Sequence, residues 1–161
     1  TKKCKASVNS NMIDGRMANP HAAFHERQAI AGRATPFLGG GAMTVTIYHN
    51  PRCSKSRTTL ALLQSRGIEP AIRLYLDEPP SAARLDEILK LLDLEPRALM
   101  RRQEPPYKEA GLDDPALTRK QLIAAMVQHP ILIERPIVVV EKRGHKKAAL
   151  GRPPEAALDI L

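Results

Sequence analysis

Cys53 is the residue of this 161-residue chain whose type and position best suit covalent chemistry. It follows a β-branched and aromatic run at 44–48 and a polar turn, and it directly precedes a segment at 54–66 with helical spacing of apolar residues. A cysteine at the start of a helix meets unpaired backbone N–H groups and the positive end of the helix dipole, and both favour a thiolate. Because the thiolate is the attacking form, this position favours a nucleophile over a small buried apolar residue.

Basic residues and one histidine lie close to Cys53 in the sequence. Arg52, Lys55 and Arg57 flank it, and cationic neighbours lower the pKa of a thiol. His49 lies four residues before it and can accept the thiol proton when neutral or stabilise the thiolate when charged. A histidine at the end of a strand can also be an ordinary polar residue. We take Cys53 and His49 as the candidate catalytic residues.

No second cysteine is available in the predicted domain to form a disulfide with Cys53. Ser56 stands where a Cys-x-x-Cys pair would have its second thiol, and the other cysteine, Cys4, lies near the N-terminus. A turnover that oxidises Cys53 therefore needs an outside thiol, such as glutathione or a small redox protein. Two distant cysteines also exclude a disulfide framework and a thiolate zinc cage.

Two groups of predicted elements surround a helical insert. The strand at 44–48, the helix at 54–66 and a second strand at 71–76 form a βαβ unit, which favours a parallel strand pair. The second group is a strand at 137–141, a hairpin partner at 147–150 and a terminal helix opened by Pro153 and running through Leu161.

The insert between the two groups consists of helices. One opens at 79–81, a short one covers 96–102, and a third starts at the capping box of Thr118 and Gln121 and runs to about residue 128. The order βαβ, insert, ββα predicts an α/β chain with a thioredoxin-like (glutaredoxin-like) fold, a mixed sheet and a helical insertion between its halves.

Residues 1–42 differ in composition from the rest of the chain. They lack a sustained apolar period, end in three glycines and carry six Lys/Arg against two Asp/Glu, whereas 43–161 carry nineteen against fifteen. Such a segment buries too little apolar surface to offset its ordering entropy. We expect a disordered extension at 1–42, with a targeting peptide as the alternative, and one domain at 43–161.

The net charge of +8 is weak support for a nucleic-acid partner, since half of it lies in 1–42. The domain also has only three tyrosines as aromatic platforms for bases. No window approaches the ~20 apolar residues of a membrane span. We expect a cytoplasmic monomer that binds neither nucleic acid nor a membrane.

The run IYHNPRCSKSR at 47–57 resembles the active-site loop of glutaredoxin-dependent arsenate reductases. The similarity continues through LYL at 74–76, PRALMR at 96–101, HPILIERPIVV at 129–139 and GRPPE at 151–155. It covers essentially all of 44–161 and none of 1–42. Each block alone is weak, but together they match in order and spacing, which makes the resemblance specific.

This resemblance implies a substrate and the residues that bind it. The family uses a nucleophilic cysteine and three arginines, which by position are Cys53 with Arg101, Arg135 and Arg152. Arginine forks match tetrahedral oxyanions and neutralise the charge that would repel a thiolate. The implied activity is reduction of arsenate to arsenite, with glutathione as co-substrate and glutaredoxin as partner. The resemblance also implies that the resting protein needs no metal and no bound organic cofactor. The fold also implies a cis peptide bond before Pro136.

Two departures and two alternatives qualify this interpretation. Better-known arsenate reductases of the family often run on past the final LDIL, and the basic segment 142–149 matches no motif. A sister group of the fold binds RNA polymerase and regulates transcription by sensing thiol oxidation, but it typically carries Cys-x-x-Cys, which Ser56 argues against. A generic monothiol oxidoreductase is the other alternative, and it would need no arginine cradle.

Overall fold

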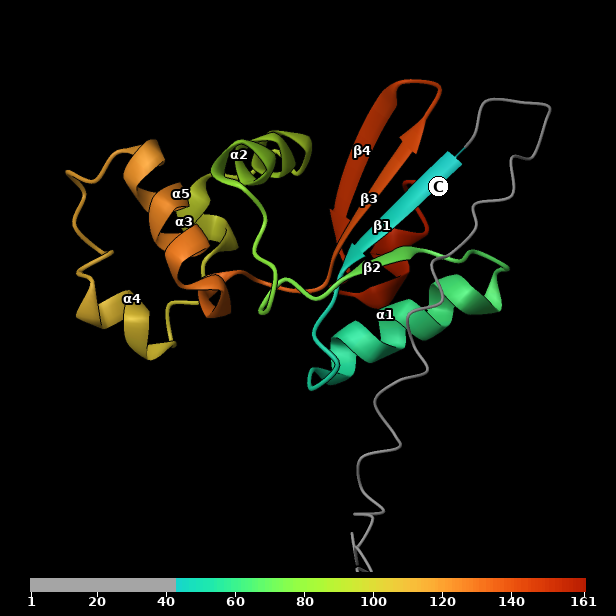
Figure 1. The fold of residues 1–161 in the computed structure, drawn as a ribbon, viewed down its shortest axis with the longest axis horizontal. Helices are drawn as coiled ribbons and strands as arrows, with labels where there is room; N and C mark the ends of the chain where they lie inside the picture. Colours follow the sequence, from blue (N-terminus) through green and yellow to red (C-terminus); the bar gives the residue numbers. More distant parts are fainter. Residues whose placement is uncertain (1–42) are drawn as a thin grey trace, which may run out of the picture. The chain divides into compact units, whose positions relative to one another are not determined.

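The computed structural model describes residues 43–161, so the predicted extension at 1–42 lies outside the described residues. Four strands form one sheet in the order β2-β1-β3-β4 (Figure 1). β1 (Met43–Tyr48) pairs in parallel with β2 (Ala71–Arg73) and antiparallel with β3 (Ile137–Lys142), which forms a hairpin with β4 (His145–Leu150). The mixed sheet and the element order confirm the predicted thioredoxin-like fold.

Alternation along the central strands divides the core between the two faces of the sheet. One face carries Val45 and Ile47 of β1 with Val138 and Val140 of β3, and it packs with Leu63 of α1 (Ser54–Ser65). The opposite face contributes residues that include Tyr48, Ile137 and Val139, and these pack with the apolar sides of the inserted helices. Because side chains alternate along a strand, the apolar run at 137–140 is buried on both faces.

The insert consists of the helices α2 (Ala82–Leu91), α3 (Pro96–Leu99), α4 (Pro105–Glu109) and α5 (Arg119–Gln128), followed by the 3-10 turn η1 (Pro130–Leu132). Side-chain caps mark the starts of α2 and α5. The side chain of Ser81 accepts a hydrogen bond from the N–H of Arg84 at the start of α2. The capping box of Thr118 and Gln121 is present at the start of α5, as predicted.

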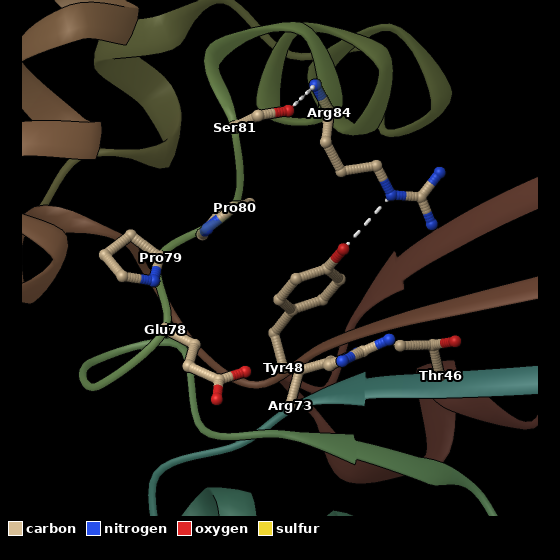
Figure 2. Close-up of a pocket in the computed structure, with 8 residues that line it drawn as sticks. All are labelled: Thr46, Tyr48, Arg73, Glu78, Pro79, Pro80, Ser81 and Arg84. Atoms are coloured by element: carbon tan, nitrogen blue, oxygen red, sulfur yellow. Dashed lines mark hydrogen bonds between the residues drawn. The ribbon is translucent and has the colours of Figure 1, made fainter.

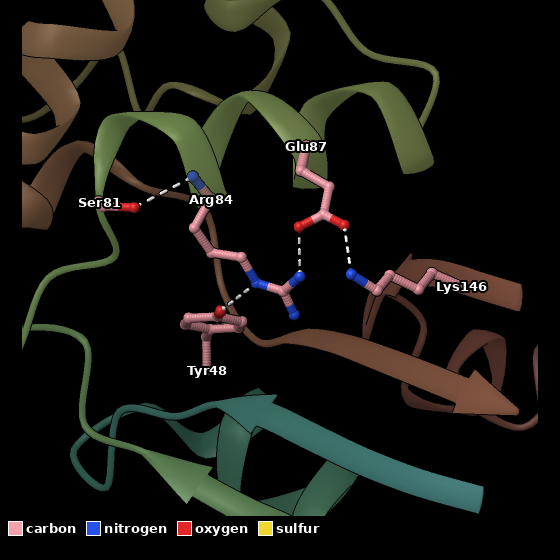
Figure 3. Close-up of polar contacts among 5 residues, drawn as sticks. All are labelled: Tyr48, Ser81, Arg84, Glu87 and Lys146. Atoms are coloured by element: carbon pink, nitrogen blue, oxygen red, sulfur yellow. Dashed lines mark hydrogen bonds and ion pairs between the residues drawn. The ribbon is translucent and has the colours of Figure 1, made fainter. Parts of the chain in front are cut away.

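A polar cluster joins α2 to the sheet (Figure 3). Arg84 donates from Nε to the hydroxyl oxygen of Tyr48 at 3.1 Å and pairs with Glu87. Glu87 also accepts from Lys146 of β4 at 2.7 Å. These side chains remain about a third exposed, so the ion pairs orient α2 more than they stabilise it.

One glycine, Gly151, lies in close contact with two other segments of the domain. A Cβ on Gly151 would lie 2.5 Å from Oγ1 of Thr59 in α1 and 2.7 Å from Cγ of Pro136. The N–H of Gly151 donates to the carbonyl of Pro136 at 2.9 Å. Only a residue without a side chain allows the chain after β4 to lie against α1 and the start of β3 together.

The second strand is shorter than predicted. β2 ends at Arg73, and Leu74 and Tyr75 form a turn where the sequence indicated a strand to residue 76. The register explains the difference, because Arg73 pairs with Tyr48, the last residue of β1. The N–H of His49 donates to the carbonyl of Arg73. After this bond the chain that follows β1 forms a loop, so β2 has no strand left to pair with.

The predicted terminal helix from Pro153 to Leu161 is also wrong. The segment forms one 3-10 turn, η2 (Pro154–Ala157). Pro153 has an extended backbone because it precedes Pro154, and a residue before proline disfavours the helical region. The sequence likewise gave no signal for α4, which is only five residues long.

Among the helices of 43–161, none combines the length and the hydropathy that crossing a bilayer requires.

Candidate active site

Cys53 occupies the N-cap position of α1, at the end of the loop that follows β1. Its backbone is extended, with φ −93° and ψ 121°, and its carbonyl accepts the first helical bond from the N–H of Arg57 at 3.0 Å. The N–H of Cys53 donates to the carbonyl of Asn50 at 3.0 Å, which closes the loop. The side chain is partly exposed, so a small molecule can reach the sulfur.

The surroundings of Cys53 lower the pKa of its thiol. Partial burial alone would raise that pKa, but the backbone N–H groups of Ser56 and Lys55 and the guanidinium of Arg135 outweigh burial. These groups stabilise the negative charge of a thiolate and leave the neutral thiol unaffected. The predicted effect of the helix start is therefore supplemented by an arginine 82 positions later in the chain.

Ser56 is the internal support of the loop. Its side chain is fully buried, and Oγ accepts the N–H of Asn50 at 3.0 Å and bonds to Nδ1 of His49 at 2.8 Å. Burial and, to a lesser extent, the charge of Arg57 lower the pKa of His49, so the ring is neutral near pH 7. A neutral ring offers Nδ1 as an acceptor for the Ser56 hydroxyl.

Within the described residues, the ring of His49 is therefore hydrogen-bonded to Ser56 and forms no hydrogen bond to the Cys53 thiol. Its predicted part in proton transfer stays a prediction. Ser56 itself was recognised only as the missing second cysteine, because nothing in the sequence indicated that its hydroxyl would be buried between His49 and Asn50.

Replacing Ser56 by Ala is expected to lower the free energy of unfolding by about 1–3 kcal/mol, because it leaves the Asn50 N–H buried without an acceptor. Urea denaturation followed by circular dichroism measures the change. Ser54→Ala is the matched control, since Ser54 is exposed on the same helix turn and should cost far less. Equal losses for the two variants would show that the buried bonds do not hold the loop.

The three predicted arginines come from separate segments and converge. Arg101 follows α3, and its N–H donates to the carbonyl of Leu132 at 2.8 Å. Arg135 lies two residues before β3, and Nε of Arg152 donates to the Arg135 carbonyl at 2.9 Å. Partial burial and the nearby charges of Arg135 and Arg152 lower the pKa of Arg101. Burial is the larger cause, and the contribution of the like charges shows that the other two guanidinium groups lie near Arg101.

Arg135 and Arg152 are each followed directly by a proline. The Arg135–Pro136 bond is cis, as predicted, and the Arg152–Pro153 bond is cis as well, which was not predicted. Arg152 precedes the 3-10 turn η2 and not an α-helix, so the expected helix N-terminus beside it is absent from this segment.

Arg135 has the most unusual environment of the three. Its Nε and Nη1 are buried and have no hydrogen-bond partner within 43–161. The same guanidinium acts on the Cys53 sulfur both through its charge and as a hydrogen-bond donor. Buried donors of a charged group are normally satisfied, so these two N–H positions are open to a partner that the described residues do not supply.

Two acidic residues that sequence reasoning missed lie among the arginines. Glu134 forms an ion pair with Nη2 of Arg152 at 2.8 Å and lies 3.7 Å from Nε of Arg101. Arg101 also pairs with Glu104. The sequence signal was present, since Glu134 directly precedes Arg135, but its pairing depends on the fold. The two carboxylates hold Arg101 and Arg152 in place, so Arg135 is the one of these three arginines without an acidic partner in the described part of the chain.

The domain has one cavity at the arginine cluster and another at the edge of the sheet. One of about 350 Å³ is lined by residues that include Arg101, Glu134 and Arg152, which places it at the arginine cluster. The other, of about 360 Å³, lies between the β2 edge and the start of α2, and Figure 2 shows its lining residues, among them Arg73 and Glu78. None of the residues that line this second cavity belongs to the predicted site.

The fold and the site together define a class: a thioredoxin-like domain with a partly exposed cysteine at a helix start, whose pKa is lowered, and an arginine cluster of which Arg135 acts on that thiol. Comparison with known proteins narrows this class. Residues 48–160 match the ArsC family, and the chain belongs to that family.

Similar proteins agree with this assignment. The uncharacterized protein YfgD of Escherichia coli K12 is 52% identical over 118 residues, which are 73% of this chain and 96% of that protein. An arsenate reductase of Haemophilus influenzae is 48% identical over 120 residues, covering 74% of this chain and 100% of the relative. The solved structure of an arsenate reductase from Vibrio cholerae superposes with a TM-score of 0.68 at 51% identity, over 74% of this chain and 99% of the other.

Proposed function

We propose that this protein is an arsenate reductase in which Cys53 is the nucleophile and Arg101, Arg135 and Arg152 bind the oxyanion. The observation that carries the proposal is the pair of unsatisfied, buried N–H positions of Arg135 beside a thiol whose pKa is lowered. Family membership and the names of the similar proteins supply the substrate.

The charge balance explains why such a site needs arginines. Arsenate is an anion and repels a thiolate, so its charge must be neutralised before sulfur can approach arsenic. Arg135 has free donors for this purpose, while Arg101 and Arg152 share theirs with Glu134. We propose that the anion takes up the free donors first and that Glu134 keeps the other two guanidinium groups oriented. His49 acts through Ser56 to hold the loop.

The proposed reaction begins when the Cys53 sulfur attacks arsenic. An S–As bond forms, an As–O bond breaks, and the departing oxygen takes up protons and leaves as water. Glutathione adds to arsenic in the same way with loss of a second water. A glutaredoxin thiol then bonds to the glutathione sulfur as a mixed disulfide, and the S–As electron pair stays on arsenic, which is reduced from As(V) to As(III). Water displaces arsenite and regenerates the Cys53 thiol.

An assay of NADPH oxidation coupled through glutathione reductase, glutathione and glutaredoxin tests this function. We expect NADPH consumption that depends on arsenate and stops when either glutathione or glutaredoxin is left out. Consumption that continues at the same rate without arsenate would instead indicate a generic monothiol oxidoreductase. Copurification with RNA polymerase and no arsenate-dependent turnover would indicate a regulator of the same fold.

The lowered pKa of Cys53 predicts how its reactivity depends on pH. Alkylation of Cys53 by iodoacetamide should rise with pH and reach half its maximal rate at a lower pH than for an unperturbed cysteine, because the lowered pKa lets thiolate form at lower pH. Mass spectrometry of the Cys53 peptide separates this reaction from that of Cys4. Arg135→Ala should move the midpoint to higher pH, and an unchanged midpoint would argue against the guanidinium–thiol contact.

A further inference from the structure

We infer that Tyr75 is a further substrate-binding residue, whose phenol hydroxyl donates a hydrogen bond to the oxyanion held beside Cys53. The inference rests on the proposed function for the identity of the anion. The hydroxyl itself is assigned from its position, its burial and its lack of a partner.

The turn after β2 carries Tyr75 to the loop that bears the thiol. The N–H of Tyr75 donates to the carbonyl of Arg73 at 3.0 Å, and the N–H of His49 donates to the same carbonyl at 2.8 Å. This shared acceptor lies where the parallel strands β1 and β2 both end. Tyr75 therefore leaves the sheet beside the segment that continues to Asn50 and Cys53. Because β2 ends at Arg73, the side chain of Tyr75 does not follow the alternation of that strand.

The ring of Tyr75 belongs to the core on the side of the arginines. It is 1% exposed and belongs to the same buried cluster as Met100 and Ile133. Met100 directly precedes Arg101, and Ile133 lies two positions before Arg135. The two core residues pair with each other as an isolated β-bridge. The segments that present the two arginines thus meet in the cluster that buries the Tyr75 ring.

The hydroxyl of Tyr75 is buried and has no hydrogen-bond partner within 43–161. It shares this condition with Nε and Nη1 of Arg135. Buried hydroxyls of native proteins are normally paired, so an unpaired one requires an explanation, and a ligand that supplies the acceptor is one. The two other buried tyrosines are ordinary in this respect, because Tyr48 accepts from Arg84 and Tyr107 donates to Asp113.

The pKa of Tyr75 responds to the groups of the site, which agrees with the place of its ring in the core beside them. Burial raises the pKa of Tyr75, while Arg135, Arg101 and the Asn50 side chain lower it and a Cys53 thiolate raises it. Because burial prevails, the phenol stays protonated and is a hydrogen-bond donor at neutral pH. A neutral donor can bind an oxyanion oxygen without adding charge to a site that already holds three arginines.

Protection of Cys53 from iodoacetamide by inorganic arsenate, and separately by phosphate, tests the inference without glutathione or glutaredoxin. In Tyr75→Phe, the anion concentration that gives half-protection should rise about 10-fold or more, since a hydrogen bond to a charged group is lost. The melting temperature should stay the same or rise, because no bond within the protein is removed.

Tyr107→Phe is the matched control. This tyrosine is equally buried, but its hydroxyl donates to Asp113 at 2.9 Å. The control should lower the melting temperature and leave anion protection unchanged. A rise in the half-protecting concentration that is confined to Tyr75→Phe supports the inference.

The other outcomes overturn the inference in distinguishable ways. Normal protection in Tyr75→Phe overturns it and leaves the proposed function intact. A shift in the pH midpoint of Cys53 alkylation without anion, with unchanged protection, means that the hydroxyl serves the thiolate and not the substrate. Absence of protection by either anion in the unmodified protein overturns the proposed function and this inference together.

Discussion

Cys53→Ser is expected to lower arsenate-dependent NADPH consumption by at least about three orders of magnitude. A serine hydroxyl at the start of α1 stays protonated near neutral pH, so the environment that lowers the pKa of the thiol cannot make it a comparable nucleophile. Oxygen also cannot take part in the exchange with glutathione and glutaredoxin that the proposed turnover requires. The coupled assay at saturating arsenate measures the loss.

Cys4→Ser provides the control for this substitution, because Cys4 lies outside the domain and its loss should leave turnover unchanged. The fold of Cys53→Ser should be unaffected, since the Cys53 side chain is partly exposed and makes no capping bond. Substantial turnover by Cys53→Ser would show that another group attacks arsenic.

Arg135→Lys is expected to lower kcat/KM for arsenate by roughly 10- to 100-fold, which corresponds to the loss of one or two charge-assisted hydrogen bonds. Lysine keeps the positive charge, but a single ammonium cannot reproduce the planar fork of Nε and Nη1 that the buried site leaves open. The charge is retained, so the pH at which Cys53 is half alkylated should change little. Loss of catalysis is thereby separated from loss of thiolate stabilisation.

The matched control for Arg135→Lys is Arg66→Lys, at an exposed arginine that ends α1. It should leave kcat/KM and the melting temperature unchanged. Normal kcat/KM in Arg135→Lys would mean that charge alone suffices, and the assignment of the open donors to the anion would then be wrong.

Local patterns were sufficient for the elements whose boundaries depend on their own residues. The strand before Cys53, the helix after it and the capping box of Thr118 all form as predicted. Elements that depend on a distant partner were less predictable. β2 stops where β1 leaves the sheet, and the chain after Arg152 follows two consecutive prolines instead of a helical path.

The same distinction applies to the site. Cys53 was predictable because its position at a helix start is a local property, and the three arginines were found only through the resemblance to a family. Glu134 and Tyr75 were missed because their significance depends on what surrounds them in the fold. Sequence cannot show that a tyrosine hydroxyl is buried without a partner or that a carboxylate lies between two guanidinium groups.

The absence of room for a methyl group at Gly151 couples the reactive sulfur to the oxyanion-binding side chains mechanically. The backbone next to Arg152 touches both the helix that begins at Cys53 and the proline that follows Arg135. Thr59 makes this contact through its side chain and Pro136 through its ring. A larger residue at position 151 would therefore push α1 or the start of β3 away from the segment that carries Arg152, and the spacing of the groups around Cys53 would change with it.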